Sequence, residues 1–259
     1  MRNINYNKYY SIIRSSRPKA IHLYDQYFMK KHGMIKQSKI TNKMFEGKKI
    51  LFLGDGDGAI SFYELLYSGG HCKKCDGIYL LDFDQRILDY HKKIHNNINS
   101  EINLNTMLYN VLDEPPKIDR CDIFYINPPY DFHNHGVIIN RWIDVCIDLC
   151  KDDALGIIIM PTDYKYNINY NYYGLDNVKK HLENNGFKIV KIYHNIHEYY
   201  NKFQPRLKSS TIIVKKVNNN RKYVEKIPKR YSFVYKKIVN LPHYVINDQI
   251  NGVNSNEWK

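Results

Sequence analysis

Apolar residues along the chain gather in short, nearly continuous runs that alternate with longer amphipathic segments. The runs are KKILFLG (48–54), GIYLLDFD (77–84), CDIFYIN (121–127) and ALGIIIMP (154–161). Near-continuous apolar runs of this length are typical of strands that are buried on both faces of a parallel sheet. The segments between them have the length of helices: AISFYELLYSG (59–69), QRILDYHKKIHNNI (85–98) and VIINRWIDVCIDLC (137–150). This alternation predicts an α/β fold.

Three further apolar segments extend the predicted sheet. INLNTMLYNV (102–111) predicts another strand. FKIVKIYHNI (187–196) and SSTIIVKKV (209–217) are expected to pair as an antiparallel edge after a helix near 174–185. A mostly parallel, seven-stranded sheet with an antiparallel last strand resembles the Rossmann-like class I methyltransferase fold of S-adenosylmethionine-dependent transferases.

We expect the chain to be organised in three parts. Residues 1–46 are predicted to be a short N-terminal helical extension, 47–217 a Rossmann-like transferase domain, and 218–259 a basic C-terminal tail rich in aromatic residues. The tail can be a solvated helix face, or it can stack on and neutralise RNA.

The composition indicates a globular intracellular protein. A chain of 259 residues with 43% apolar content can bury a core. No apolar run approaches the roughly 18 to 20 residues that cross a bilayer, and the N-terminus lacks the apolar centre of a signal peptide. The five cysteines are an odd number and suit reduced thiols, and the Cys72 and Cys75 pair lacks the further ligands of a metal site. We therefore expect a soluble, cytoplasmic protein with no metal and no membrane partner; the oligomeric state is left open.

The net charge of the chain is +13. It favours an anionic partner such as nucleic acid, because Lys and Arg neutralise phosphates. The many Asn, Ile, Lys and Tyr residues also fit a coding sequence rich in A and T, which raises the lysine content without selection for binding. Nucleic acid is therefore one possible partner and not the only one.

A glycine turn with two carboxylates follows the first predicted strand, as Gly54, Asp55, Gly56, Asp57 and Gly58. Glycines between a strand and a helix allow positive φ and let a ligand approach the backbone, next to the free N–H groups of the helix N-terminus. Two aspartates would repel a phosphate, so the turn suits a ligand with a cationic end and hydroxyls, such as an adenosyl sulfonium. The alternative is a tight turn with an Asp that caps the helix.

The second predicted strand ends at Asp82 and Asp84. An acidic residue at this place in a dinucleotide-type fold accepts hydrogen bonds from ribose hydroxyls. Either aspartate can serve in this role.

The motif Asn127-Pro128-Pro129-Tyr130 follows the strand IFYI. Two prolines lack N–H donors, so the strand must stop there and its carbonyls are left to accept. An Asn side-chain oxygen and the following Pro carbonyl can hold both protons of an amino group, and Tyr130 can stack on a planar base or face a cation. The alternative is a rigid strand-ending turn.

Two families carry such motifs. A [DN]PP[YF] motif after the fourth strand resembles the amino-methyltransferases, which methylate exocyclic nitrogens of adenine or cytosine, or a glutamine amide. RPKAIHLYDQYFM, GKKILFLGDGDGAIS, YLLDFDQRILDY and IFYINPPY, followed by HGVIINRWIDVCIDL, resemble the catalytic domain of the branched-chain polyamine synthases over roughly residues 17 to 165. That family transfers aminopropyl groups from decarboxylated S-adenosylmethionine to a polyamine nitrogen.

The second resemblance implies the roles of several residues. Gly54, Asp55, Gly56 and Gly58 would bind the decarboxylated S-adenosylmethionine, or S-adenosylmethionine itself in a methyltransferase, together with Asp82 and Asp84. Gly56 and Asn127 stand where that family has aspartates. The element with Asp25, Tyr27 and Phe28 would close over the substrate, so we place these three residues at the pocket rim.

The protonation of the acceptor separates the two functions. A polyamine amine has a pKa near about 10.4 and must lose a proton to a carboxylate before attack, whereas an exocyclic aromatic amine is neutral. Asn127 favours the aromatic amine. Carboxylates expected at strand ends favour a polycation, and either Asp57 or Asp131 can replace the missing base. These strand-end carboxylates are Asp55, Asp57, Asp82, Asp84, Asp113, Glu114 and Asp131.

We therefore expect an aminopropyltransferase that acts on a polyamine, with an amino-methyltransferase as the alternative. A third possibility is a protein that binds an adenosyl ligand or nucleic acid without catalysis. The catalytic residues would be Asn127, Pro128, Tyr130, Asp57 and Asp131. His133 and His135 are expected in a loop over the site, and Trp142 in the core.

Overall fold

The structure is a computed structural model that describes residues 6–21, 26–56, 58–70, 74–98, 101–130, 137–162, 174–201 and 206–218. Asp25, Asp57 and Asp131 lie outside the described residues, as do His133 and His135. So does the predicted C-terminal tail, apart from its first residue.

Seven strands form one sheet in the order β3-β2-β1-β4-β5-β7-β6. Their bounds are β1 Lys49–Leu53, β2 Gly77–Asp82, β3 Asn103–Leu108, β4 Cys121–Ile126, β5 Cys150–Met160, β6 Phe187–Glu198 and β7 Lys208–Lys216. β1 pairs in parallel with β2 and β4, whereas β7 runs antiparallel to both of its neighbours, β5 and β6. The predicted α/β fold with an antiparallel last strand is confirmed.

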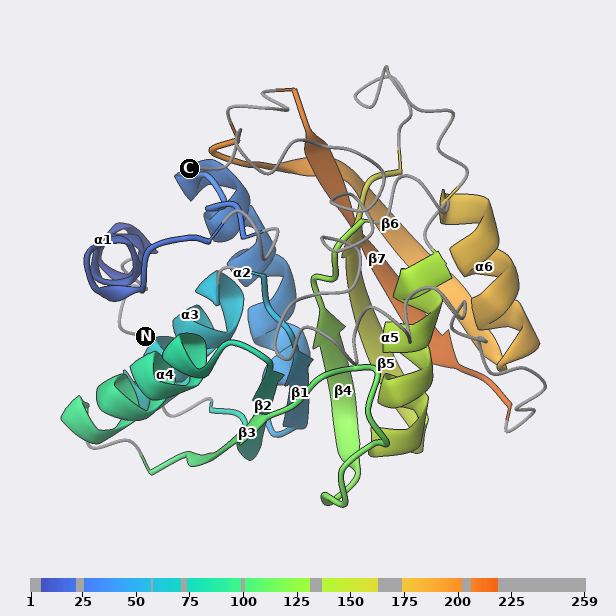
Figure 1. Cartoon of the computed structure of the whole chain (residues 1–259), viewed down its shortest axis with the longest axis horizontal. Helices are drawn as coiled ribbons and strands as arrows, with labels where there is room; N and C mark the ends of the chain where they lie inside the picture. Colours follow the sequence, from blue (N-terminus) through green and yellow to red (C-terminus); the bar gives the residue numbers. More distant parts are fainter. Residues whose placement is uncertain are drawn as a thin grey trace, which may run out of the picture.

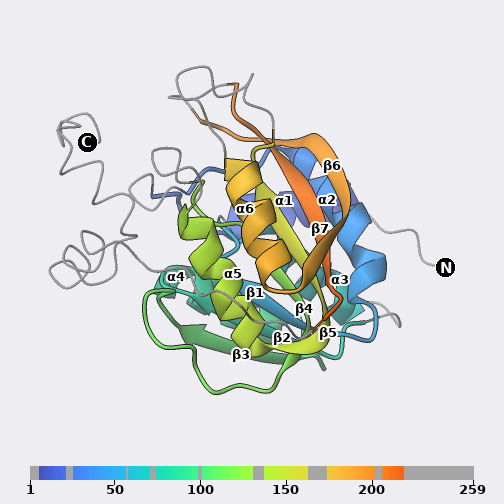
Figure 2. The same ribbon diagram turned by 90° about the vertical axis from the view of Figure 1, so that its right-hand side faces the viewer.

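Helices cover both faces of this sheet (Figure 1). Their bounds are α1 Tyr6–Ser16, α2 Lys31–Phe45, α3 Ala59–Gly70, α4 Gln85–Asn97, α5 Val137–Leu149 and α6 Gly174–Asn184. α3 and α4 lie on one face and α5 and α6 on the other, as Figure 2 also shows. α2 contacts α3 and β6, and α1 packs on α2 and α3. None of the described helices is long and apolar enough to span a membrane.

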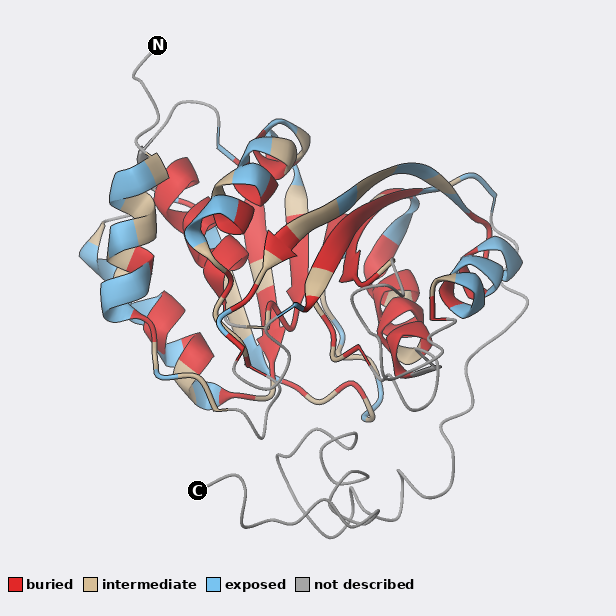
Figure 3. Ribbon diagram, turned by 90° about the horizontal axis from the view of Figure 1, so that it is seen from above, coloured by how far each residue is buried: buried red, intermediate tan, exposed pale blue. Residues whose placement is uncertain are grey.

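The core lies along the central strands. The last four residues of β1 are all buried, which is the pattern of a strand covered on both faces. Figure 3 shows the buried residues concentrated in the sheet and on the inner sides of the helices. This two-sided burial explains why the apolar runs of the sequence predict the strands well.

β5 differs from its prediction, because it begins at Cys150 instead of residue 154. Cys150 pairs with Cys121 of β4, and the register then shifts before Ile123 pairs with Leu155. The residues of β5 from 151 to 153 are exposed and charged. Because strands are predicted here from runs of apolar residues, the charged residues at the start of β5 were not recognised as part of the strand.

Candidate functional site

The candidate site lies at the carboxyl ends of β1, β2 and β4. β1 is hydrogen-bonded to β2 on one side and to β4 on the other, so the strand order reverses between β1 and β4. Open α/β sheets bind their ligands outside the carboxyl ends of the strands at such a switch point.

The glycine turn has the backbone that the sequence predicts. Gly54, Gly56 and Gly58 have φ values of 56°, 61° and 68°, which L side chains rarely adopt. A β-carbon at Gly54 would lie 2.3 Å from the ring of Trp142. Trp142 is buried, as expected of a core residue, and it forms the support on which the turn rests.

The turn and the proline motif meet at Asn127. The backbone N–H of Asn127 donates to the carbonyl of Gly54, with 3.2 Å between nitrogen and oxygen. A β-carbon at Gly56 would lie 2.6 Å from Nδ2 of Asn127. The glycine turn and the proline motif therefore share one contact surface, with Gly56 and Asn127 71 residues apart in the chain.

Asp55 is engaged inside the protein. Its carboxylate accepts a hydrogen bond from the backbone N–H of Ser61 at 2.5 Å, in the first turn of α3, and the residue is only 1% exposed. The Ser61 hydroxyl lies 2.9 Å from Nε2 of the buried His91. Asp55 thus takes the helix-capping role that the sequence left open as the alternative.

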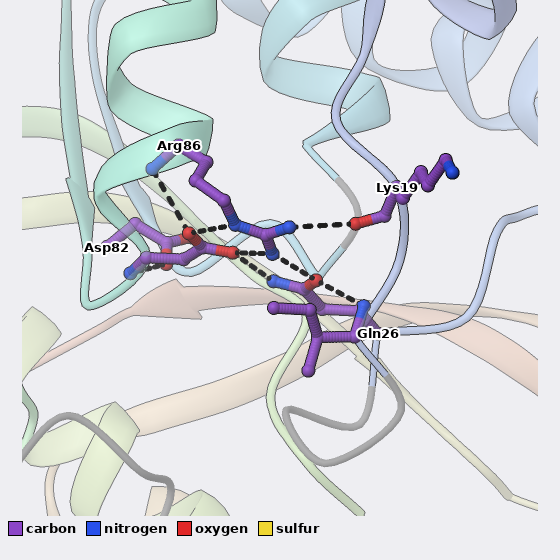
Figure 4. Close-up of polar contacts among 6 residues, drawn as sticks. Lys19, Gln26, Asp82 and Arg86 are labelled. Carbon is purple, nitrogen blue, oxygen red and sulfur yellow. Dashed lines mark hydrogen bonds and ion pairs between the residues drawn. The ribbon is translucent and has the colours of Figure 1, made fainter. Parts of the chain in front are cut away.

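Arg86 and Gln26, both labelled in Figure 4, bond to Asp84. It is the N-cap of α4, and its Oδ1 accepts from the Arg86 backbone N–H at 3.1 Å and from Arg86 Nε at 2.9 Å. Its Oδ2 lies 2.5 Å from Arg86 Nη2 and accepts from Gln26 Nε2 at 2.8 Å. Both carboxylate oxygens of Asp84 are therefore used within the protein.

Asp82 is different, although it is only two residues away. It ends β2, is 6% exposed, and accepts the backbone N–H of Asp84 at 2.8 Å. Burial raises the pKa of Asp82 to about 7. A buried carboxyl that titrates near neutral pH at a strand end is typical of functional sites. That Asp82, and not Asp84, binds a ligand stays a prediction.

Gln26 and Arg86 were not among the predicted site residues. Gln26, which donates to Asp84, also accepts the backbone N–H of Ile21 at 3.0 Å, and Arg86 Nη1 donates to the carbonyl of Lys19 at 3.1 Å. These contacts attach the segment before α2 to the start of α4. Gln26 directly follows Asp25 in the segment RPKAIHLYDQYFM that carries the family resemblance, but only Asp25, Tyr27 and Phe28 of this segment were predicted to lie at the site.

Two of the three predicted rim residues are described. The ring of Phe28 lies 3.3 Å from the Arg17 guanidinium carbon, measured to the ring centroid, and 5.1 Å from that of Arg14. Tyr27 is half-buried and packs on the core. The placement of Tyr27 and Phe28 at a pocket rim stays a prediction, and Asp25 lies outside the described residues.

Tyr130 is buried, and its hydroxyl lies 2.7 Å from that of Tyr199. Pro128 is buried beside it, whereas Asn127 and Pro129 are partly exposed. The motif thus anchors one end in the protein and leaves Asn127 accessible next to the glycine turn.

The carboxylates expected at the strand ends do not all face solvent, which corrects the prediction. Asp55, Asp82 and Asp84 are buried, whereas Asp113 and Glu114 are exposed. Carboxylates at strand-to-helix junctions satisfy the free N–H groups of the helix starts, which draws them inward. Among the described residues, less negative charge faces solvent at this edge than the sequence suggests.

Comparisons with known proteins show the family and the fold of the chain. The model of the family described as branched-chain polyamine synthase A C-terminal domain matches residues 5–255. The branched-chain polyamine synthase of Thermus thermophilus, in complex with N4-aminopropylspermidine and 5'-methylthioadenosine, is similar with a TM-score of 0.64 and 16% identity, over 92% of this chain and 69% of that chain. The C9 mutein of that synthase, in complex with the same two molecules, has a TM-score of 0.62 and 16% identity, over 84% of this chain and 66% of that chain.

A proposed RNA methyltransferase from Pyrococcus horikoshii has a TM-score of 0.57 and 13% identity, over 82% of this chain and 99% of that chain. These structural likenesses show the fold. The chain spans about two thirds of the length of the Thermus thermophilus structures. No curated protein matched by sequence.

Proposed function

The chain belongs to the family of the branched-chain polyamine synthase A C-terminal domain, and we propose that it transfers an aminopropyl group from decarboxylated S-adenosylmethionine to a nitrogen of a polyamine. It is a transferase of the class I S-adenosylmethionine-dependent type, and the proposal concerns the group and the acceptor. The observation that carries it is the contact of Gly56 with Asn127, because it brings the donor turn and the amine-binding motif together.

The nucleoside of the donor is proposed to lie over the glycine turn, with its ribose hydroxyls on Asp82. The positive φ angles of Gly54 and Gly56 keep side chains away from the ligand. Asp84 cannot take this role without giving up its bonds to Arg86 and Gln26. The 5'-methylthioadenosine in the Thermus thermophilus complex supports a donor of the same nucleoside class.

Asn127 is proposed to orient the acceptor nitrogen. A lone pair of that nitrogen forms the new N–C bond while the C–S bond of the sulfonium breaks, and the electron pair of that bond leaves with sulfur as a neutral thioether. Because a polyamine nitrogen arrives protonated, its proton must first pass to a base. An amide is not a base, so we assign this role to Asp57 or Asp131.

Amino-methylation from S-adenosylmethionine is the second candidate. The observation that favours it is the neutral surface where Gly56 meets Asn127, since the resembling polyamine synthases have an aspartate at each position. A neutral aromatic amine needs no carboxylate there. The exposed acids Asp113 and Glu114 favour the polyamine instead, because they attract a cation and repel a nucleic-acid backbone.

Calorimetry with four adenosyl ligands tests the proposal. Aminopropyl transfer predicts that decarboxylated S-adenosylmethionine and methylthioadenosine bind at least about tenfold more tightly than S-adenosylmethionine and adenosylhomocysteine, a difference of about 1.4 kcal/mol. The reverse order would favour methylation. Tight binding of these ligands without turnover of any amine would favour the non-catalytic alternative.

A further inference from the structure

A chain of buried hydrogen bonds leads from the proline motif into the protein. The Tyr130 hydroxyl lies 2.7 Å from the Tyr199 hydroxyl, which lies 2.6 Å from Oγ of Ser209. Oγ of Ser209 lies 2.9 Å from Nδ1 of His197. Tyr130 and Tyr199 are 7% and 6% exposed, and Ser209 and His197 are fully buried. Because no water competes there, each contact restrains its neighbours strongly.

This series of hydrogen bonds ends on α2, which lies outside the sheet. Nε2 of His197 lies 2.9 Å from the amide oxygen of Gln37, and the Thr211 hydroxyl donates to the same oxygen. Gln37 and Thr211 are also fully buried. A helix that precedes the first strand is thus connected through β6 and β7 to the residue that closes the proline motif.

The orientation of the Gln37 amide sets the direction of the hydrogen bonds in this series. With its oxygen facing His197, which leaves Gln37 Nε2 without a partner among the described residues, the hydrogen of the His197 ring is on Nε2, and Nδ1 accepts from Ser209. Ser209 then accepts from Tyr199, and Tyr199 accepts from Tyr130. The single hydroxyl hydrogen of Tyr130 therefore points into the protein, toward Tyr199.

We propose that Tyr199, Ser209, His197 and Gln37 are positioning residues that hold the ring of Tyr130 for the acceptor amine. The hydroxyl of Tyr130 is used for this anchoring, and its ring, not its hydroxyl, meets the substrate. The ring of an anchored tyrosine attracts an ammonium group, which matches a polycationic acceptor. The identity of the acceptor rests on the proposed function, whereas the anchoring does not.

The two possible roles of the hydroxyl predict different double mutants. If the hydroxyl only anchors the ring, Tyr130→Phe and Tyr199→Phe both break the bond between the two hydroxyls, and Tyr199→Phe also removes the bond to Ser209. Adding Tyr130→Phe to Tyr199→Phe then costs no further affinity. If the hydroxyl of Tyr130 contacts the substrate, Tyr130→Phe costs more than Tyr199→Phe, and the losses multiply.

The experiment is calorimetry of spermidine binding to protein saturated with methylthioadenosine. We expect each single variant to weaken spermidine about 5- to 10-fold, the size of one lost hydrogen bond, with an unchanged affinity for methylthioadenosine. The double variant should match the Tyr199→Phe variant. Tyr90→Phe is the matched control, because Tyr90 is also 7% exposed and its hydroxyl donates to the carbonyl of Ile13. Multiplying losses, or a Tyr199→Phe variant that binds like wild type, would overturn the proposal.

A second readout separates this proposal from the proposed function. Nitrogen-15 NMR should show the ring of His197 neutral, with its hydrogen on Nε2, and Ser209→Ala should shift the Nδ1 signal; the His197→Asn variant identifies both signals. This result supports the anchoring chain even if spermidine does not bind to wild type, in which case the proposed acceptor is wrong. A hydrogen on Nδ1 would reverse the chain and overturn the inference.

Discussion

Gly56 lies so close to Asn127 that a β-carbon at position 56 would stand 2.6 Å from the amide nitrogen of Asn127. The resembling polyamine synthases have a carboxylate at each of these positions, and this chain has neither. A side chain at position 56 would therefore require the amide group of Asn127 to move. The donor turn and the acceptor motif are in contact at this point.

Gly56→Ala should cost more stability than Gly47→Ala. Both glycines have a left-handed backbone, with φ values of 61° and 64°, but a β-carbon at Gly47 meets nothing within 4 Å. We expect a loss of about 1 kcal/mol for Gly47→Ala from the backbone alone and about 2 to 3 kcal/mol for Gly56→Ala. Urea unfolding of both variants measures the difference. Equal losses would mean that the contact with Asn127 does not constrain the turn.

Asn127→Ala should abolish turnover and leave the binding of methylthioadenosine unchanged, since the side chain is assigned to the acceptor. Asn127→Asp should increase the rate with an aliphatic amine, because the added carboxylate can take the ammonium proton; the expected gain is about tenfold or more. Initial rates with spermidine across pH test this. A loss of methylthioadenosine affinity in Asn127→Ala would move Asn127 out of the acceptor site.

Asp82→Asn and Asp84→Asn should affect different properties, the first ligand affinity and the second stability. Asp82→Asn is expected to weaken methylthioadenosine by at least about tenfold, because an amide accepts ribose hydroxyls less well than a carboxylate. Asp84→Asn should lower the free energy of unfolding by about 1 to 3 kcal/mol, since it removes the ion pair with Arg86 and weakens the cap of α4. Calorimetry measures the affinity of both variants for methylthioadenosine, and urea unfolding measures their stability. If Asp84→Asn alone loses the ligand, the two roles are exchanged.

The protein should lose stability as the pH rises above neutral. Glu64 of α3 is buried, and burial raises its pKa from 4.5 to about 8; burial also raises the pKa of Asp82 from 3.8 to about 7. Such carboxyls stabilise the folded state fully below their ordinary pKa, and this contribution is lost as the pH rises through the raised value. Between its ordinary and its raised pKa, each of these carboxyls lowers the free energy of unfolding by about 1.4 kcal/mol for every pH unit of increase.

Two buried histidines limit the pH range of this test. Burial lowers the pKa of His91 to about 4 and that of His197 to about 3, so their contribution is lost only as the pH falls below 6.5. Urea unfolding between about pH 6.5 and 8.5 therefore isolates the carboxyls. Glu64→Gln should remove most of the slope. A wild-type stability that rises over this range would contradict the assignment.

The sheet was accessible from the sequence because its strands are covered on both faces. Continuous apolar runs such as residues 50–53 mark such strands directly, and strand ends place the motifs that follow them. The contact between the glycine turn and Asn127 follows from this topology alone. The start of β5 was missed because Lys151, Asp152 and Asp153 interrupt its apolar pattern.

The polar contacts of the site could not be predicted from the sequence in the same way. Gln26 reaches Asp84 across 58 residues, and Tyr130 reaches Tyr199 across 69 residues. Such pairs follow no period, and they depend on side-chain placement at the end of folding. Asp82 and Asp84 are equivalent in the sequence, and the bonds that Asp84 accepts from Arg86 and Gln26 distinguish them.

Mass spectrometry of the product tests the proposed reaction most directly. The purified protein is incubated with spermidine and either decarboxylated S-adenosylmethionine or S-adenosylmethionine, with the Asn127→Ala variant as control. We predict that spermidine gains one aminopropyl group in place of a hydrogen, together with an equal amount of methylthioadenosine, and that the variant forms neither. Transfer of a methyl group, with adenosylhomocysteine as the second product, would contradict the account.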